Sequence, residues 1–186
     1  MGIPRFEASG HLPLGRHVCT LDEFEEAFVD APTFATSSTR GRLFSDFLAA
    51  LAWLQSHYAA DLVERAWVGG GFTSEKLDPT DIDVTFVVSD DAHEALGEVK
   101  QGKLLKLLRK GGFKGVGLSV DGFMMIRERI ALPWFGSGVG DAGQDYFLKR
   151  GAWDDWWSRD RANVAAGDPP VIEDAEPVRG YVEVSV

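Results

Sequence analysis

The stretch "WVGGGFTSEKLDPTDIDVTFVV", Trp67 to Val88, decides the fold of this chain. It joins a short apolar run to three glycines, a polar loop and two alternating aspartates that precede a β-branched run. The pattern predicts a strand over residues 66–68 and a second strand over residues 83–88 whose alternate residues share one face. Carboxylates at the entrance of a buried strand are costly to desolvate, so we expect a cation to meet them.

The rest of the chain predicts helices and strands around these two. Thr20 and Glu23 form a capping box that predicts a short helix. Apolar residues recur at three- and four-residue steps in residues 37–63, which indicates a long amphipathic helix. The other expected elements are an extended surface segment over residues 10–18, a helix over 92–109, a third strand within 116–126, a partly helical segment over 144–161 and a closing strand over 178–186.

This order of elements predicts an α/β (α+β) fold in which helices cover a small mixed sheet. With 186 residues, 45% of them apolar, we expect one domain spanning 1–186. Residues 1–36 would form a strap and short helix, 37–126 the core, and 127–186 a C-terminal extension. No signal peptide or membrane-spanning run is visible, and Cys19 is the lone cysteine, which favours a cytoplasmic protein.

The charge distribution limits the partners. A net charge of −10 argues against a protein that grips duplex DNA through its phosphates. Residues 100–114, however, hold six basic residues and no acid. This run is either a solvated helix face or a local seat for phosphates, including those of RNA.

Three aspartates form the candidate catalytic and metal-binding set. Asp81 and Asp83 are two residues apart, so they point to the same side of a strand. Asp121 on the next predicted strand turns to that side if Val120 packs inward, and adjacent strands lie about 4.8 Å apart. Asp121 has a second interpretation, as the cap of an Asp-Gly turn. Converging carboxylates can hold two metal ions for in-line phosphoryl transfer.

The glycine loop supplies the candidate phosphate-binding set. Gly70 and Gly71 leave the backbone open to close approach by a ligand, and their N–H groups can form a concave anion seat. Thr73, Ser74 and Lys76 add two hydroxyls and one cation within the same loop. Each motif alone is weak, since Asp-x-Asp and glycine triplets are common in turns. The order strand, glycine loop, strand, helix, strand makes the set more specific.

Other candidates carry less information. Trp134, Trp153, Trp156 and Trp157 can stack on a base or pack in the core, and helical spacing favours packing. The basic residues that follow the third strand could reach a triphosphate, although nothing in the sequence fixes them there: Arg127, Arg129, Lys149 and Arg150. The glycines of residues 136–140 are too few for a dinucleotide fingerprint and indicate a loop.

The segment "GGGFTSEKLDPTDIDVTF" resembles the signature of the polymerase-β superfamily of nucleotidyltransferases, in which Gly-Ser and a loop of about ten residues precede Asp-x-Asp. The chain is most similar to a bacterial branch of small uncharacterised nucleotidyltransferase-like proteins. That branch likewise has a "G-x-LP-x-G-x-H" strap as in 10–17, a "TL-x-EF" helix as in 20–24, and an aromatic segment with a basic residue before Gly180. The resemblance implies a minimal nucleotidyltransferase fold with extensions at both ends.

The resemblance also implies a function. Asp81, Asp83 and Asp121 would bind two Mg²⁺ (or Mn²⁺) ions, Asp121 serving also as a base, and an NTP would donate its nucleoside monophosphate to a hydroxyl of a protein or RNA acceptor. Gly71 departs from the family pattern because it replaces the serine that contacts the terminal phosphates. That departure motivates an alternative, a catalytically silent binding protein such as a toxin–antitoxin or phage-defence component that works with a partner protein.

Overall fold

The computed structural model describes residues 2–134, 139–165 and 168–186, and its centre is a mixed five-stranded sheet. The strands run in the order β1-β5-β2-β3-β4. Pairs β1/β5 and β3/β4 are parallel, whereas β5/β2 and β2/β3 are antiparallel. The strands are β1 (Gly15–Thr20), β2 (Val63–Gly69), β3 (Ile82–Ser89), β4 (Val120–Arg127) and β5 (Gly180–Ser185).

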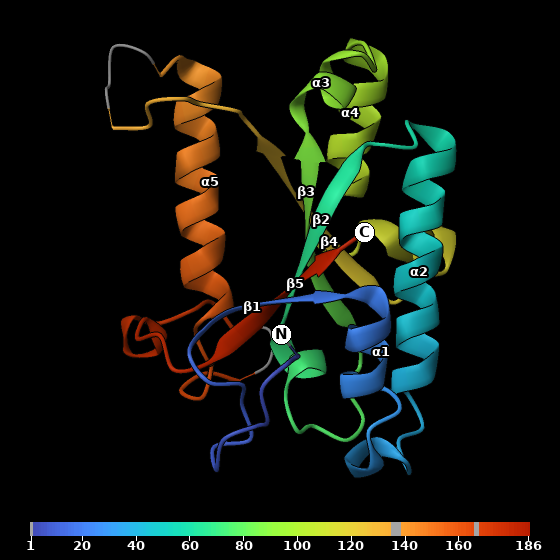
Figure 1. Ribbon diagram of the computed structural model, residues 1–186, viewed down its shortest axis with the longest axis vertical. Helices are drawn as coiled ribbons and strands as arrows, with labels where there is room; N and C mark the ends of the chain where they lie inside the picture. Colours follow the sequence, from blue (N-terminus) through green and yellow to red (C-terminus); the bar gives the residue numbers. More distant parts are fainter. Residues whose placement is uncertain (1, 135–138, 166–167) are drawn as a thin grey trace.

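Helices cover both faces of the sheet, which confirms the predicted α/β class (Figure 1). One face packs against α1, α2, α3 and α4, and the other packs against α5. The α-helices are α1 (Leu21–Phe28), α2 (Arg40–His57), α3 (Asp90–Glu94), α4 (Glu98–Leu107) and α5 (Asp141–Trp157). Short 3-10 helices are η1 (Pro32–Phe34), η2 (Gly70–Thr73), η3 (Gly112–Val116) and η5 (Ile172–Asp174).

The alternation within β3 assigns its residues to these two faces. Ile82, Val84, Phe86 and Val88 belong to the main core with α1 and α2. Asp83, Thr85 and Val87 therefore face α5. The α5 side carries a smaller aromatic core, made of Trp67, Val87, Met125, Tyr146, Trp157 and Tyr181. The sheet thus has an apolar face and a face on which polar side chains can reach a site.

Two sequence-based expectations need correction. The helix predicted over residues 92–109 is broken into α3 and α4 because Gly97 adopts a positive φ of 71°, which an α-helix does not accommodate. The segment predicted to lie over the surface at 10–18 instead enters the sheet from Gly15 as the edge strand β1, parallel to β5. The capping box of Thr20 and Glu23 is present as predicted.

A buried arginine at the first turn of α2 organises the segment between β2 and β3. The Arg40 side chain is almost fully buried and donates to the carbonyls of Phe28, Phe72, Ser74 and Lys76 at 2.7–2.9 Å. Burial lowers the pKa of its guanidinium to about 10, so it keeps its charge at neutral pH. Three of the four acceptors lie in the loop that follows Gly70, so α2 fixes this loop.

A second tie joins the same loop to α2. The Asp78 carboxylate accepts the Ser38 backbone N–H at 2.7 Å and the hydroxyls of Ser37 and Ser38 at 3.1 Å. These hydrogen bonds lower the pKa of Asp78. The N-terminal strap adds a third tie, since the Glu75 N–H donates to the Gly10 carbonyl at 2.9 Å. Hydrogen bonds from the start of α2 and the residues before it, and one to the N-terminal segment, therefore fix the polar loop between β2 and β3.

We predict that Arg40→Lys destabilises the fold. Lysine keeps a charge but lacks the planar fork that meets four carbonyls, so buried acceptors lose their donors. The expected loss in the free energy of unfolding, measured with denaturant, is about 2–4 kcal/mol. Arg42→Lys, at an exposed site with an i,i+4 partner in Asp46, is the control and should change it by less than about 0.5 kcal/mol. Equal stability of the two variants would contradict this role for Arg40.

Candidate functional site

The structure brings Asp83 and Asp121 together on the α5 face of the sheet. The two residues are register partners in the parallel pair β3/β4, so their side chains point to the same face on adjacent strands. Val120 packs in the main core, which turns Asp121 to the opposite side as the alternation predicted. Asp121 and Gly122 lie within β4, so the alternative of an Asp-Gly turn is wrong. Asp81 lies one residue before β3.

The three carboxylates repel one another at this position. Burial, together with the charges of Asp81 and Asp121, raises the pKa of Asp83 to about 7, and Arg179 and Lys110 oppose this shift. Asp121 is buried, and its Oδ1 accepts the Gly111 N–H at 2.8 Å. The Asp81 Oδ1 accepts the Thr80 hydroxyl at 3.2 Å. Negative charge is therefore concentrated at the start of β3.

The three glycines have different surroundings. A Cβ on Gly69 would lie 2.5 Å from the indole of Trp157, so helix α5 packs directly on this backbone. Gly70 has φ of 71°, and a Cβ there would collide with the Asp83 Oδ2. A Cβ on Gly71 would meet only Lys76 Cδ at 3.4 Å and Pro79 Cβ at 4.0 Å. The backbone at Gly70 closely approaches a side chain of the protein itself, the Asp83 carboxylate, whereas the sequence suggested a close approach to a ligand. Gly71 has room for a side chain.

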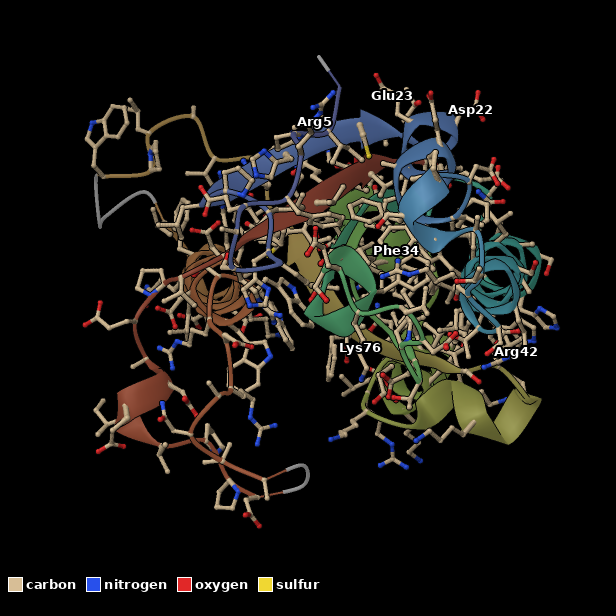
Figure 2. The ribbon with its side chains drawn as sticks, turned by 90° about the horizontal axis from the view of Figure 1, so that it is seen from below. Arg5, Asp22, Glu23, Phe34, Arg42 and Lys76 are labelled. Carbon is tan, nitrogen blue, oxygen red and sulfur yellow. The ribbon has the colours of Figure 1, made fainter. Side chains whose placement is uncertain are left out.

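The predicted phosphate-binding side chains divide into two groups. Thr73 is buried and donates to the Gly70 carbonyl at 3.3 Å, so its hydroxyl helps to fold the loop. The Ser74 hydroxyl donates to the Gly71 carbonyl at 2.9 Å. Lys76 is exposed beside them. Figure 2 looks at this end of the molecule, with the segment that carries Lys76 between α5 and the layer of α1 and α2.

A pocket of about 380 Å³ opens where the glycine turn faces the end of α5. It contains five of the eight residues predicted for the site, namely Gly70, Gly71, Ser74, Lys76 and Asp83. Thr73, Asp81 and Asp121 are not among its lining residues. The other lining residues come from the N-terminal segment, from β4 and the residues before it, from the end of α5 and from the segment between α5 and β5: His11, Lys110, Phe123, Trp156, Trp157, Arg159, Asp160, Arg161 and Arg179.

Sequence reasoning missed the arginines of this pocket. These arginines follow α5 and are far from the glycine turn in sequence: Arg159, Arg161 and Arg179. The one feature noted in the sequence was the basic residue before Gly180, which is Arg179. The basic residues considered earlier have other neighbours: Arg127 pairs with Glu64, Arg129 with Asp91, Lys149 with Asp145, and Arg150 donates to the Tyr146 hydroxyl. The predicted loop at 136–140 lies largely outside the described residues.

The tryptophans of α5 pack against the sheet, as their helical spacing predicted. The Trp157 indole N–H donates to the Thr85 hydroxyl at 3.0 Å, and its ring covers Gly69. Trp153 packs on Phe123, with ring centroids 4.6 Å apart. Trp156 is only partly buried and lines the pocket. The Trp156 ring at the end of α5 thus remains partly exposed to a ligand in the pocket.

The carboxylates suit a hard divalent cation that keeps several other ligands. Within the described ranges no group of three His, Cys, Asp or Glu side chains is arranged closely enough to hold a metal ion by itself. Mg²⁺ commonly takes one or two carboxylates and fills its remaining positions with water and substrate phosphates. Asp83 and Asp121 supply two such carboxylates on adjacent strands. Burial and then repulsion from Asp81 and Asp121 raise the pKa of Asp83, and a bound cation would relieve that repulsion.

The chain belongs to a family whose function is not assigned. Residues 4–185 match the family described as "Family of unknown function (DUF6932)". The chain matches no curated protein and no solved structure. In the part of the chain that the structure describes, none of the helices combines the length and apolar character needed to cross a membrane.

We predict that the glycines respond differently to substitution. Gly69→Ala should lower the free energy of unfolding by about 1–3 kcal/mol because the methyl group overlaps the Trp157 ring. Gly71→Ser should leave it within about 0.5 kcal/mol. Denaturant unfolding of the two variants measures the difference. If Gly71→Ser is the more damaging change, the geometry assigned to this turn is wrong.

We predict that stability of the metal-free protein falls as pH rises from about 4 to 7. The folded protein holds the Asp83 proton over this range whereas the unfolded chain releases it, so the unfolded state gains relative to the folded one until pH passes about 7. Asp83→Asn should abolish this slope and raise the free energy of unfolding at pH 8 by about 1–3 kcal/mol. Parallel urea titrations at pH 4.5, 6 and 8 measure it. An unchanged slope in the variant would contradict the assignment.

Proposed function

We propose that this protein is a metal-dependent nucleotidyltransferase that moves a nucleoside monophosphate from an NTP to a hydroxyl of a protein or RNA acceptor. The observation that carries the proposal is the pairing of Asp83 with Asp121 beside the positive-φ turn at Gly70. Carboxylates and an open backbone at one position match the needs of a metal-bound polyphosphate. The resemblance of 69–83 to the polymerase-β superfamily agrees with this assignment.

Each residue has a role in this proposal. Asp83 and Asp121 would hold Mg²⁺ or Mn²⁺, with Asp81 as the third carboxylate for a second ion. The N–H groups of Gly70 and Gly71, with Lys76, would bind phosphate oxygens. Bound metal would supply charge neutralisation at those oxygens. The remaining catalytic contribution would be to position the substrate. The hydrogen bonds from Arg40 to the carbonyls of Phe72 and Ser74 support this role because they fix the glycine loop.

The reaction is a displacement at the α-phosphorus. The acceptor oxygen forms a bond to that phosphorus while the bond to the pyrophosphate oxygen breaks. The Oδ1 of Asp121 is engaged by the Gly111 N–H, so its Oδ2 is the atom assigned to take the proton of the acceptor hydroxyl. Pyrophosphate leaves with the negative charge that the cations of the pocket neutralise.

One observation favours a second candidate function, a silent relative that binds a nucleotide without transferring it. Gly71 lacks the hydroxyl found in active members of the superfamily, and the neighbouring Ser74 hydroxyl is directed to a backbone carbonyl. A binding or interaction protein would keep the pocket and need no turnover. Because Gly71 has room for a side chain, Gly71→Ser separates the two candidates. If the protein is an enzyme, the wild-type protein transfers nucleotide and Gly71→Ser should increase that transfer. A silent relative shows no transfer as wild type, and any transfer would require the added hydroxyl.

We predict that Asp81→Asn with Asp83→Asn reduces transfer by at least about 1,000-fold, because the variant loses two carboxylates that hold the metal. The assay incubates protein, Mg²⁺ and each radiolabelled NTP with cell RNA and protein fractions, and follows label incorporation. EDTA should abolish incorporation in the wild-type protein.

The matched control carries Asp22→Asn and Asp61→Asn, two exposed aspartates outside the pocket. It has the same change in net charge and should retain wild-type transfer. Circular dichroism and thermal unfolding establish that both variants fold. Transfer retained by the Asp81/Asp83 variant refutes the proposed function, and NTP binding without incorporation on any acceptor supports the silent relative.

A further inference from the structure

The pocket beside the glycine turn collects positive charge in an acidic protein. Five cationic and two acidic side chains line it, although the whole chain has a net charge of −10. Three of the cations are arginines that follow α5, and they define what we call the arginine cluster: Arg159, Arg161 and Arg179. A concentration of guanidinium groups in a concave site attracts multivalent anions.

The arginine cluster has donors that the protein does not use. Within the described residues the Arg179 side chain makes one hydrogen bond, from Nη1 to the Gly70 carbonyl at 3.4 Å. Arg161 donates to the Asp168 carbonyl, and Arg159 pairs with Asp155. The Nε atom of each of the three is buried and has no hydrogen-bond partner in the described parts of the chain. Guanidinium groups that donate this little to protein can still donate to a ligand.

Unpaired buried polar atoms concentrate at this pocket. Seven such side-chain atoms occur among the described residues, and four of them belong to pocket-lining residues. The fourth is the Nδ1 of His11, whose Nε2 lies 3.6 Å from Asp160. Native proteins leave few buried polar groups unpaired, so their concentration around one cavity favours the binding of a polar partner there. The Nε of Arg40 is also among the seven, but the Nη atoms of Arg40 donate four hydrogen bonds to carbonyls, whereas the Arg179 side chain makes a single one within the described residues.

The cluster lies next to the candidate metal site. Arg179 contacts the Gly70 carbonyl, and its charge acts on Asp83. Burial lowers the pKa of Arg179, which Asp160 and Asp83 partly offset, so its guanidinium is held away from water beside a carboxylate. A ligand with phosphates spaced along a chain can therefore meet the glycine turn at one end and the cluster at the other. The cavity of about 380 Å³ falls within the range of small-molecule sites.

We infer that the arginine cluster is a polyphosphate seat, which anchors the terminal phosphates of an NTP in place of the serine hydroxyl that Gly71 lacks. The inference deepens the proposed function and rests on it for the identity of the nucleotide. Anion binding itself rests on the arginines alone and needs neither divalent metal nor turnover. The C-terminal extension thus completes a site that the glycine turn begins.

Isothermal titration with inorganic tripolyphosphate, in EDTA at low salt, tests the seat without requiring catalysis. Arg159→Gln/Arg161→Gln/Arg179→Gln should weaken tripolyphosphate binding at least about 30-fold, and Arg161→Gln alone about fivefold. The charge-matched control is Lys100→Gln/Lys103→Gln/Lys106→Gln on the exposed face of α4, which should change the affinity less than about twofold. If the triple arginine variant does not fold, Arg161→Gln and Arg179→Lys provide the comparison.

The ligand series identifies the source of the phosphates. ATP and GTP should lose affinity in parallel with tripolyphosphate, whereas AMP and inorganic phosphate should bind the wild-type protein at least about tenfold more weakly. Equal loss in the lysine control, or AMP binding as tight as ATP, overturns the inference. A wild-type protein that binds tripolyphosphate through these arginines but transfers no nucleotide contradicts the proposed function and leaves the seat established. If the wild-type protein transfers nucleotide and the triple arginine variant binds tripolyphosphate as tightly as the wild type, the seat is refuted and the proposed function stands.

Discussion

Four backbone carbonyls receive N–H groups from one buried guanidinium, that of Arg40, and three of them belong to the loop between β2 and β3. That loop has no strand partner over most of its length, so its polar backbone needs donors from elsewhere. Arg40 supplies them from the first turn of α2, stacked over Phe34 at 3.6 Å. The position of α2 on the sheet therefore fixes where Gly70 stands relative to Asp83.

One face of the sheet carries most of the hydrophobic core, and the other carries the candidate catalytic carboxylates. The face toward α1 and α2 is apolar and holds most of the core. The face toward α5 carries Asp83 and Asp121 at one end, and the aromatic cluster around Trp67 and Tyr181 covers the rest. Trp157 joins the two parts because its ring rests on Gly69 and its N–H binds Thr85. Asp83, whose pKa is raised, and its neighbour Asp121 therefore lie at the edge of this packed layer, where a ligand can still reach Asp83.

Local patterns predicted the central elements well. The amphipathic stripe identified α2, the capping box identified α1, and period-two alternation placed Asp83 and Asp121 on the same face. These features depend on residues close in sequence or on strict strand geometry. The break at Gly97 was missed because a single glycine within a helical pattern does not reveal the sign of its φ angle.

The remainder of the site could not be predicted because it depends on contacts distant in sequence. Arg40 and the loop carbonyls are about 32–36 residues apart, and Arg179 is 109 residues from Gly70. No sequence period links such pairs. The arginine cluster became visible only when the chain beyond α5 returned to the glycine turn. The sequence suggested that Gly71 stands where a serine is expected, and only the structure showed that a serine side chain would have room there.

Crystals of the protein soaked with Mn²⁺ and a non-hydrolysable NTP would test the central claim most directly through the anomalous signal of the metal. The account predicts an anomalous peak within about 2.2 Å of carboxylate oxygens of both Asp83 and Asp121, with the phosphates passing over Gly70. A nucleotide bound elsewhere, or a metal peak that neither carboxylate touches, would contradict it.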